Sequence, residues 1–386
     1  MTAGFTLRQK LHCSPAAAWN LLTDPDQMCR WSSAPISPLS SGPQDRFDTP
    51  GALRMVTLPG GRAKLREVIE DAEFPTTFRY RVYDGGPLLV DHHGHQELVE
   101  TSDGVEVHWT VHMTLFPGVL SHVMARKIRG EVQRSLEVMA TIATELDDAP
   151  LIPPSTHPRR EPDDLDDLVA SALAIRDLQQ QIADDLAGSD DPKQWFARVY
   201  QYVTETMIDA ATGRLELGLT HPDWVLAIIP VFHDYFARNL HAYRSGGDVE
   251  EPWQIAWSTC EIVNPEKPHL PVMEGLLAGV SAHIEADLPR ALAQVHLDRY
   301  PDRDLREFRP DYLRLAPVFT IASDRLLADL PRSHKPWWAG IAGRFNTPIP
   351  RRLARPHRLR RGPASRPSVR TRRGVGREPP VTTKTW

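Results

Sequence analysis

Residues 117–146 read PGVLSHVMARKIRGEVQRSLEVMATIATEL, a stretch in which apolar side chains recur every three or four positions. The series runs from Leu120 through Ile128 and Val132 to Leu146. This period is typical of an α-helix that buries one face. The stretch therefore predicts one long amphipathic helix of about 28 residues, and the segments before it decide what the helix packs against.

The segments before this helix alternate apolar and polar side chains, which is the period of a half-buried β-strand. Phe5, Leu7 and Leu11 lie in the first such strand, and Ser14-Pro15 then marks the start of a short helix. Further strands are expected at 52–58, 63–71, 76–84, 88–100 and 105–115. A strand, two short helices, a strand meander and one long helix together predict an α+β domain over residues 1–147.

The pattern changes after residue 147. Residues 148–163 are rich in proline and charge and are expected to form a linker. Residues 164–340 have helical period without strand alternation, which predicts an all-α domain. Its helices are expected at 164–187, 192–211, 222–244, 252–263, 271–297 and 310–330. Residues 341–386, rich in arginine and proline, are expected to be a disordered tail.

Charge is distributed unevenly along the chain, whose formal net charge is −5. Residues 341–386 hold thirteen basic and one acidic side chain, and residues 1–340 hold 32 basic and 49 acidic ones. An acidic body is a poor match for nucleic acid, because phosphate contacts need Lys and Arg on one face. We therefore expect no specific nucleic-acid binding, and only the tail could contact polyanions.

Cysteine usage and hydropathy indicate a cytoplasmic protein. Cys13, Cys29 and Cys260 are an odd, widely spaced set, which argues against a disulfide framework. The N-terminal residues lack the apolar core of a signal peptide. No stretch of about 18 apolar residues suggests a transmembrane helix.

Four segments of the N-terminal region resemble, in order, the START-like helix-grip superfamily, also called SRPBCC. They are SPAAAWNLLTDPDQMCRW, LREVIEDAEFPTTFRYRV, DGVEVHW and the long helix. The similarity is greatest to the polyketide cyclase/dehydrase and lipid-transport branch. This resemblance implies an antiparallel sheet wrapped on the long C-terminal helix, with a cavity for an apolar or amphipathic ligand between them. It implies no catalytic residues, because the family has no universal triad or metal site.

The second domain resembles an uncharacterised bacterial helical family. The similar stretches are VFHDYFARNL and GLLAGVSAHIEADLPRAL. Glu285 stands where that family shows Asn, which puts in doubt any role carried over to this position. The resemblance implies a helical architecture and little about function.

Residues 91–113 contain five of the sixteen histidines. A two-residue hairpin turn at Asp103-Gly104 would place Glu97 opposite Thr110, His95 opposite His112 and His93 opposite Thr114. Since side chains alternate, one face then carries His93, His95, Glu97, His108, Thr110 and His112. The other face carries Val107, Trp109, Val111 and Met113.

Burial of the apolar face against the long helix is expected to contribute most to the free energy of folding, so the face with the histidines is expected to point outward into solvent. Two alternatives stay open. One is a zinc site of His95 and His112 with His93 or Glu97. The other is that the histidines line the cavity. A four-residue loop at 84–87 would put Tyr80 on the same side of the sheet as the histidines, and only a β-bulge, for which Gly94 is a plausible position, would then keep the histidines outside.

The apolar face and the long helix predict a ligand cavity. Its candidate ligand-binding residues are Tyr80, Trp109, Val111, Met113, Leu120, Met124 and Ile128. The same side chains could instead simply fill a core. Cyclase or dehydratase chemistry would need an acid/base pair in the cavity, and the candidates are Glu97 with His112 or Tyr80.

His283 and Asp287 lie four residues apart on one face of a predicted helix, and His233 lies in another. Such residues from several helices can form a metal site inside a bundle. We favour the simpler interpretation that His283 is a core histidine with a hydrogen-bonding partner.

No GxGxxG, GxxxxGK[ST] or GxSxG motif occurs, and no cofactor is expected. Binding of a small hydrophobic or amphipathic ligand, such as a lipid, polyketide or isoprenoid, is the function best supported by the sequence. The alternatives are a polyketide aromatase/cyclase or dehydratase, and a metal-dependent enzyme centred on the helical domain.

Overall fold

The computed structural model describes residues 2–58, 63–146, 153, 165–267 and 269–331. Almost all of the predicted linker and the whole predicted tail lie outside the described residues. The predicted bounds of the two domains stay predictions. The described chain has two hydrophobic cores, one within residues 3–146 and one within residues 165–330.

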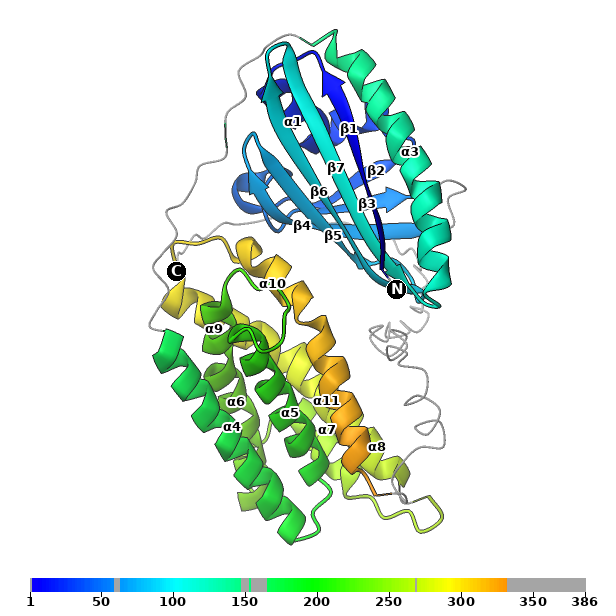
Figure 1. Cartoon of the computed structure of the whole chain (residues 1–386). Helices are drawn as coiled ribbons and strands as arrows, with labels where there is room; N and C mark the ends of the chain where they lie inside the picture. Colours follow the sequence, from blue (N-terminus) through cyan, green and yellow to red (C-terminus); the bar gives the residue numbers. More distant parts are fainter. Residues whose placement is uncertain (1, 59–62, 147–152, 154–164, 268, 332–386) are drawn as a thin grey trace, which may run out of the picture. The chain divides into compact units, whose positions relative to one another are not determined.

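The N-terminal domain contains one antiparallel sheet of seven strands in the order β1-β7-β6-β5-β4-β3-β2 (Figure 1). The strands are β1 (Thr2–Leu11), β2 (Ile36–Ser40), β3 (Leu53–Thr57), β4 (Lys64–Glu73), β5 (Thr77–Asp84), β6 (Leu89–Thr101) and β7 (Gly104–Leu115). Six of these strands were predicted. Strand β2 was not predicted, because its ISPLS sequence has no clear alternation and contains a proline, which favours an edge position.

Two short helices connect β1 to β2, namely α1 (Pro15–Thr23) and α2 (Pro25–Trp31). The Ser14 hydroxyl accepts a hydrogen bond from the Ala17 amide at 3.2 Å and caps α1. The Asp24 carboxylate accepts from the first amides of α2 in the same way. The Ser14 cap, followed by Pro15, explains why the predicted helix start at Ser14-Pro15 is confirmed.

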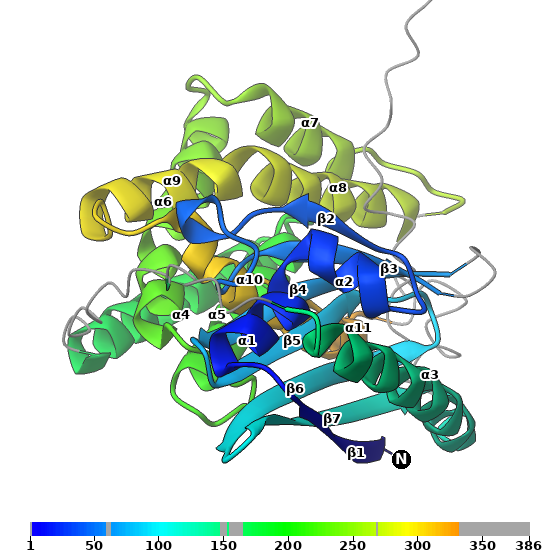
Figure 2. The same ribbon diagram turned by 90° about the horizontal axis from the view of Figure 1, so that it is seen from above.

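The long helix α3 (Val119–Ala143) runs along the β1 and β7 side of the sheet (Figures 1 and 2). Val132, Leu136 and Met139 are buried on its inner side. They share a core with inward-facing strand residues such as Leu7 and Trp109. The predicted α+β helix-grip architecture is confirmed.

The second domain is helical throughout its described residues (Figure 1). Its longer helices are α4 (Leu165–Gly188), α5 (Gln194–Ala211), α6 (Pro222–Ser245), α7 (Glu251–Cys260), α8 (His269–Ser281), α9 (Leu288–Arg299) and α11 (Ala316–Asp329). The short α10 (Arg309–Arg314) precedes α11. The prediction of an all-α domain is confirmed.

One predicted helix, 271–297, has an irregular centre. A π-helical segment, Ala282–Asp287, lies between α8 and α9. Pro289, the second residue after this segment, has no amide hydrogen to donate to the preceding turn, which disfavours regular α-helical bonding there. Single π-helical turns inside α-helices are frequent at functional sites. Within the described residues no helix is long and apolar enough to cross a membrane.

Candidate functional site

The pairing of β6 with β7 decides which way the hairpin histidines point. His93 lies opposite His112, whereas Thr114 was its predicted partner. All three predicted pairs are wrong by the same two residues, because the two-residue turn lies one position earlier, at 102–103. A shift of the pairing by two residues keeps each side chain on its predicted face.

Four of the five hairpin histidines lie on the outer face of the sheet, which points away from α3. His93, His95, His108 and His112 are partly buried there. The rings of His93 and His112 stack with their centroids 5.0 Å apart. The outward orientation is confirmed for these four, although they are less solvated than predicted and burial lowers the pKa of His95.

His92 lies on the inner face and is only 5 % exposed. His92 was not part of the group predicted to face outward, and strand alternation places it on the inner face with Gly94 and Gln96. Burial lowers the pKa of the His92 imidazole, which keeps the ring neutral near pH 7. Its Nδ1 atom has no hydrogen-bonding partner among the described residues.

Tyr80 reaches the same inner face, because it pairs with Gly94 across β5 and β6. The expected bulge at Gly94 is wrong, and the register shift in β6 lies between Leu89 and Asp91 instead. Gly94 has a different role. A Cβ atom at this position would lie 2.2 Å from the Tyr80 ring, so the absence of a side chain makes room for the phenol.

The Tyr80 phenol is held by hydrogen bonding and by burial. Its hydroxyl accepts a hydrogen bond from Trp109 Nε1 at 3.2 Å. Trp109 in turn packs edge-on against Trp31, with ring centroids 6.0 Å apart. Burial raises the pKa of Tyr80 well above its usual value, so the hydroxyl keeps its proton.

An ion pair lies next to Tyr80 in the domain interior. Arg54 Nε donates to Glu67 Oε2 at 2.7 Å, and both side chains are buried. The Arg54 guanidinium also lies over the Tyr80 ring, 4.9 Å from its centroid. We refer to Arg54, Glu67, Tyr80, His92 and Gln96 as the interior polar cluster.

Gln96 is the fifth member of this cluster and is 1 % exposed. It lies opposite Trp109 on β7 and Phe78 on β5, which are both buried. Its Oε1 atom has no hydrogen-bonding partner among the described residues. Unpaired buried polar atoms are few in native proteins, and each one needs a physical explanation.

The structure brings together four of the predicted ligand-binding residues. Tyr80, Trp109, Val111 and Met113 are buried on the inner face, and Ile128 of α3 packs against the same core. Leu120 and Met124 are each 36 % exposed.

The start of α3 presents smaller residues than Leu120 and Met124 to the sheet. Its buried residues are Ser121 and Ala125. The Ser121 hydroxyl accepts from the Leu115 amide at 2.9 Å, which ties the first turn of α3 to the end of β7.

The predicted acid/base candidates are separated by the sheet. Glu97 is exposed and His112 is partly buried on the outer face, whereas Tyr80 lies inside. Glu67 and His92 are titratable groups that lie in the interior with Tyr80.

A small cavity borders the interior polar cluster. Its lining includes Met28, Arg54 and Ile69, and its volume is about 10 Å3. A cavity of this size has room for about one water molecule. A lipid-sized ligand therefore needs interior side chains or the covering elements to move.

Arg54, Glu67 and Gln96 were missed because charged and amide side chains in strands usually face solvent. One signal was present in β4. Glu67 shares its strand face with Ile69, so strict alternation places the carboxylate on the apolar side. The burial of Arg54 follows from its pairing with Glu67 across β3 and β4, which a single sequence does not reveal.

In the helical domain, His283 Nδ1 lies 2.8 Å from Asp287 Oδ2, and both side chains are buried. His233 is also buried, in α6. Across the described ranges, no group of three or more His, Cys, Asp or Glu side chains is arranged to hold a metal ion. This finding covers both predicted alternatives, the zinc site on β6 and β7 and the cluster of His233, His283 and Asp287.

Two family matches divide the chain. Residues 2–144 match the family described as polyketide cyclase / dehydrase and lipid transport, and residues 173–354 match a family of unknown function, DUF5995. The N-terminal domain is a START-like helix-grip domain. Its family binds hydrophobic ligands and includes polyketide cyclases. A search of the curated proteins found no match.

Several solved structures are similar to part of this chain. A START superfamily protein from Mycobacterium smegmatis is 8 % identical, with a TM-score of 0.31, and the alignment covers 38 % of this chain and 99 % of that one. The di-domain ARO/CYC StfQ of the steffimycin biosynthetic pathway is 17 % identical, with a TM-score of 0.32, covering 38 % and 51 %. A Rhodobacter sphaeroides protein is 17 % identical, with a TM-score of 0.31, covering 37 % and 93 %.

Proposed function

We propose that the START-like domain binds one small amphipathic molecule between the inner face of its sheet and α3. The apolar body of the ligand would contact Trp109, Val111 and Met113, and its polar group would meet the interior polar cluster. Tyr80 belongs to both sets. Ile128 would extend the apolar contact along α3, whereas Leu120 and Met124, which were predicted to do so, are exposed.

The observation that supports this proposal is the presence of two unpaired polar atoms in the interior, beside apolar side chains and a buried ion pair. His92 Nδ1 and Gln96 Oε1 have no partner among the described residues. An unpaired buried group costs about 1–3 kcal/mol, which a ligand hydrogen bond can recover. Ligand sites typically combine apolar walls with a few placed polar groups, and this interior has that composition.

The polar members of the site favour a ligand with a neutral head group. Arg54 and Glu67 already neutralise each other at 2.7 Å. A charged ligand would therefore lose its hydration without gaining a counter-ion, because both charges of this pair are already compensated. Fatty alcohols, isoprenoids and polyketides combine an apolar body with neutral oxygen atoms, and they are the classes we propose.

Trp109→Ala tests the site. The substitution removes the largest apolar wall and the donor to the Tyr80 hydroxyl, so we expect the affinity of the full chain for a fluorescent fatty alcohol to fall by about tenfold or more. The measurement is a fluorescence titration, with circular dichroism to confirm that the variant is folded.

Val99→Ala is the matched control, because Val99 is partly exposed on the outer face of β6. We expect this variant to bind the probe as the unsubstituted chain does. Equal binding by folded Trp109→Ala and Val99→Ala proteins would contradict the proposed site.

A second candidate function is cyclase or dehydratase chemistry on a polyketide-like substrate. It is favoured by the inward position of an imidazole and a phenol, His92 and Tyr80, which can both hydrogen-bond to an oxygen atom of a substrate. Their ring centroids lie 6.3 Å apart. Turnover that is lost in a His92→Gln variant with ligand binding retained would distinguish this chemistry from binding alone.

A further inference from the structure

The interior of the helical domain contains a second group of buried polar side chains. Gln179 of α4, Tyr200 of α5, His233 of α6 and His283 of the π-helical segment are at most 4 % exposed. Each has one polar atom without a partner among the described residues. These atoms are Gln179 Oε1, the Tyr200 hydroxyl oxygen, His233 Nε2 and His283 Nε2.

These four side chains are contiguous. The Tyr200 ring lies 4.5 Å from the His283 ring and 6.2 Å from the His233 ring, centroid to centroid. Gln179 Nε2 lies 3.4 Å from His233 Nδ1. Four unpaired polar atoms in one small volume far exceed the usual frequency of such groups in a protein interior.

The hydrogen bonds of Asp287 determine what His283 can offer a ligand. The Asp287 carboxylate accepts from Trp253 Nε1 at 2.9 Å and from Arg290 at 2.5 Å. The His283 Nδ1 atom, 2.8 Å from the same carboxylate, therefore carries the ring proton. Burial lowers the pKa of His283, so the ring is neutral and Nε2 is a free acceptor.

The other members supply donors. Burial raises the pKa of Tyr200 well above its usual value, so its hydroxyl keeps its proton and can donate. The Gln179 amide nitrogen donates to His233 Nδ1, which places the His233 proton on Nε2. The group thus presents acceptors and donors side by side.

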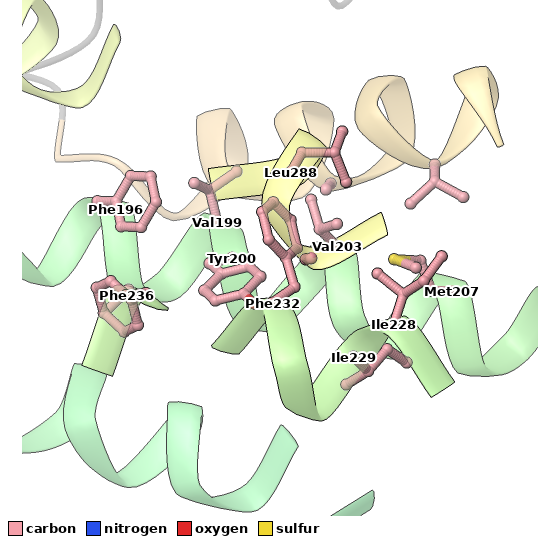
Figure 3. Close-up of a cluster of buried hydrophobic side chains, with 14 of the residues drawn as sticks. Phe196, Val199, Tyr200, Val203, Met207, Ile228, Ile229, Phe232, Phe236 and Leu288 are labelled. Atoms are coloured by element: carbon pink, nitrogen blue, oxygen red, sulfur yellow. The ribbon is translucent and has the colours of Figure 1, made fainter. Parts of the chain in front are cut away.

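Phe232 lies between this polar group and an apolar cavity. The cavity has a volume of about 40 Å3, and its lining includes Val203, Met207, Ile228 and Phe232. The Phe232 ring also stacks on His283, with centroids 3.5 Å apart and an interplanar angle of 6°. Figure 3 shows Phe232 between Tyr200 and the apolar side chains that line the cavity. A rotation of this one ring would join the cavity to the polar atoms.

We propose that the helical domain binds a small neutral alcohol, with its alkyl chain in this cavity and its hydroxyl between His283 Nε2 and the Tyr200 hydroxyl. An alcohol donates one hydrogen bond and accepts another, which matches the free acceptor of His283 and the free donor of Tyr200. A ketone or an ether accepts only and leaves His283 unpaired, whereas a carboxylate or an ammonium group would bring an unpaired charge into the interior.

The cavity volume limits the alkyl chain to a short one. About 40 Å3 corresponds to roughly three water-sized positions, and displacement of Phe232 adds to it. We therefore choose 1-hexanol as the probe and hexyl methyl ether as its matched control, because the ether retains the acceptor oxygen and loses the donor hydrogen.

The decisive variant is Tyr200→Phe in the full chain. The hydroxyl has no protein partner among the described residues, so its removal should leave the melting temperature unchanged or raise it. We expect 1-hexanol to bind saturably in isothermal titration, with affinity reduced about tenfold both for the ether and in the Tyr200→Phe protein.

Two further variants separate this site from the START-like domain and from nonspecific effects. Tyr235→Phe removes a hydroxyl from a partly exposed tyrosine of α6 and should bind 1-hexanol normally. The tenfold loss caused by Tyr200→Phe should persist in a Trp109→Ala background, because the two substitutions lie in different domains and their effects should add. The proposal would be overturned if 1-hexanol and the ether bound equally well, or if Tyr200→Phe bound 1-hexanol as tightly as the unsubstituted chain. It would also be overturned if only Trp109→Ala lost binding, or if no saturable binding were found.

Discussion

Replacement of Arg54 by Met will destabilise the START-like domain by about 3–5 kcal/mol, because it leaves the Glu67 carboxylate buried without its counter-ion. Glu67 is 4 % exposed, so water cannot take the place of the guanidinium without rearrangement. The loss also removes the cation that lies over the Tyr80 ring. Urea unfolding of the full chain, combined with hydrogen exchange of the β3 and β4 amides, measures the effect.

A second substitution tests the cause. Arg54→Met combined with Glu67→Leu removes both charges and should recover most of the lost stability, because an apolar pair needs no compensation. The control is Arg66→Met, which breaks an exposed pair with Asp84 at 3.4 Å and should cost about 1 kcal/mol or less. If Arg54→Met unfolds at the same urea concentration as Arg66→Met, the ion pair is not the stabilising interaction described above.

Acid will destabilise the helical domain through His233, by roughly 3 kcal/mol at pH 4 and below. Burial, together with the neighbouring His283, lowers the pKa of His233 to about 4. The unfolded chain has the ordinary value of about 6.5 and therefore binds more protons between these two pH values. The contribution of His233 to the free energy of unfolding is therefore fully present above pH 6.5 and is lost as the pH falls toward 4.

The measurement is the free energy of unfolding as a function of pH for the unsubstituted chain and for His233→Gln. The variant should show a shallower loss between pH 6.5 and 4, because Gln does not titrate. His241→Gln serves as the control, since His241 is exposed on the same helix and should not alter the slope. Identical slopes for the unsubstituted chain and His233→Gln would show that His233 does not lose a proton on folding.

Strands and helices with strong periodicity were predictable from single segments. The alternation in β7 placed Trp109 and Met113 on the inner face, and the structure agrees. The turn of the β6–β7 hairpin was misplaced by one position, because Ser102-Asp103 and Asp103-Gly104 are both acceptable turn sequences. The error was harmless because the resulting shift is even.

The features missed by the sequence analysis depend on contacts between segments. The inward position of Glu67 is intelligible only with Arg54, which lies on the next strand. The π-helical segment around His283 is only six residues long, so its i→i+5 hydrogen bonding leaves little trace in the helical period of the sequence. The interior polar cluster and the polar group of the helical domain both arise in this way.

The central claim is that an amphipathic ligand lies between α3 and the inner face of the sheet. Photocrosslinking tests it most directly, with the full chain, a fatty alcohol that carries a diazirine on its alkyl chain, and peptide mapping of the labelled residues. We predict labels on inward-facing residues of β5–β7 and on α3, among them Trp109 and Met113. The labels should be displaced by unmodified fatty alcohol and reduced in Trp109→Ala. Displaceable labels confined to the outer face of the sheet or to residues 165–331, or no displaceable label, would contradict the claim.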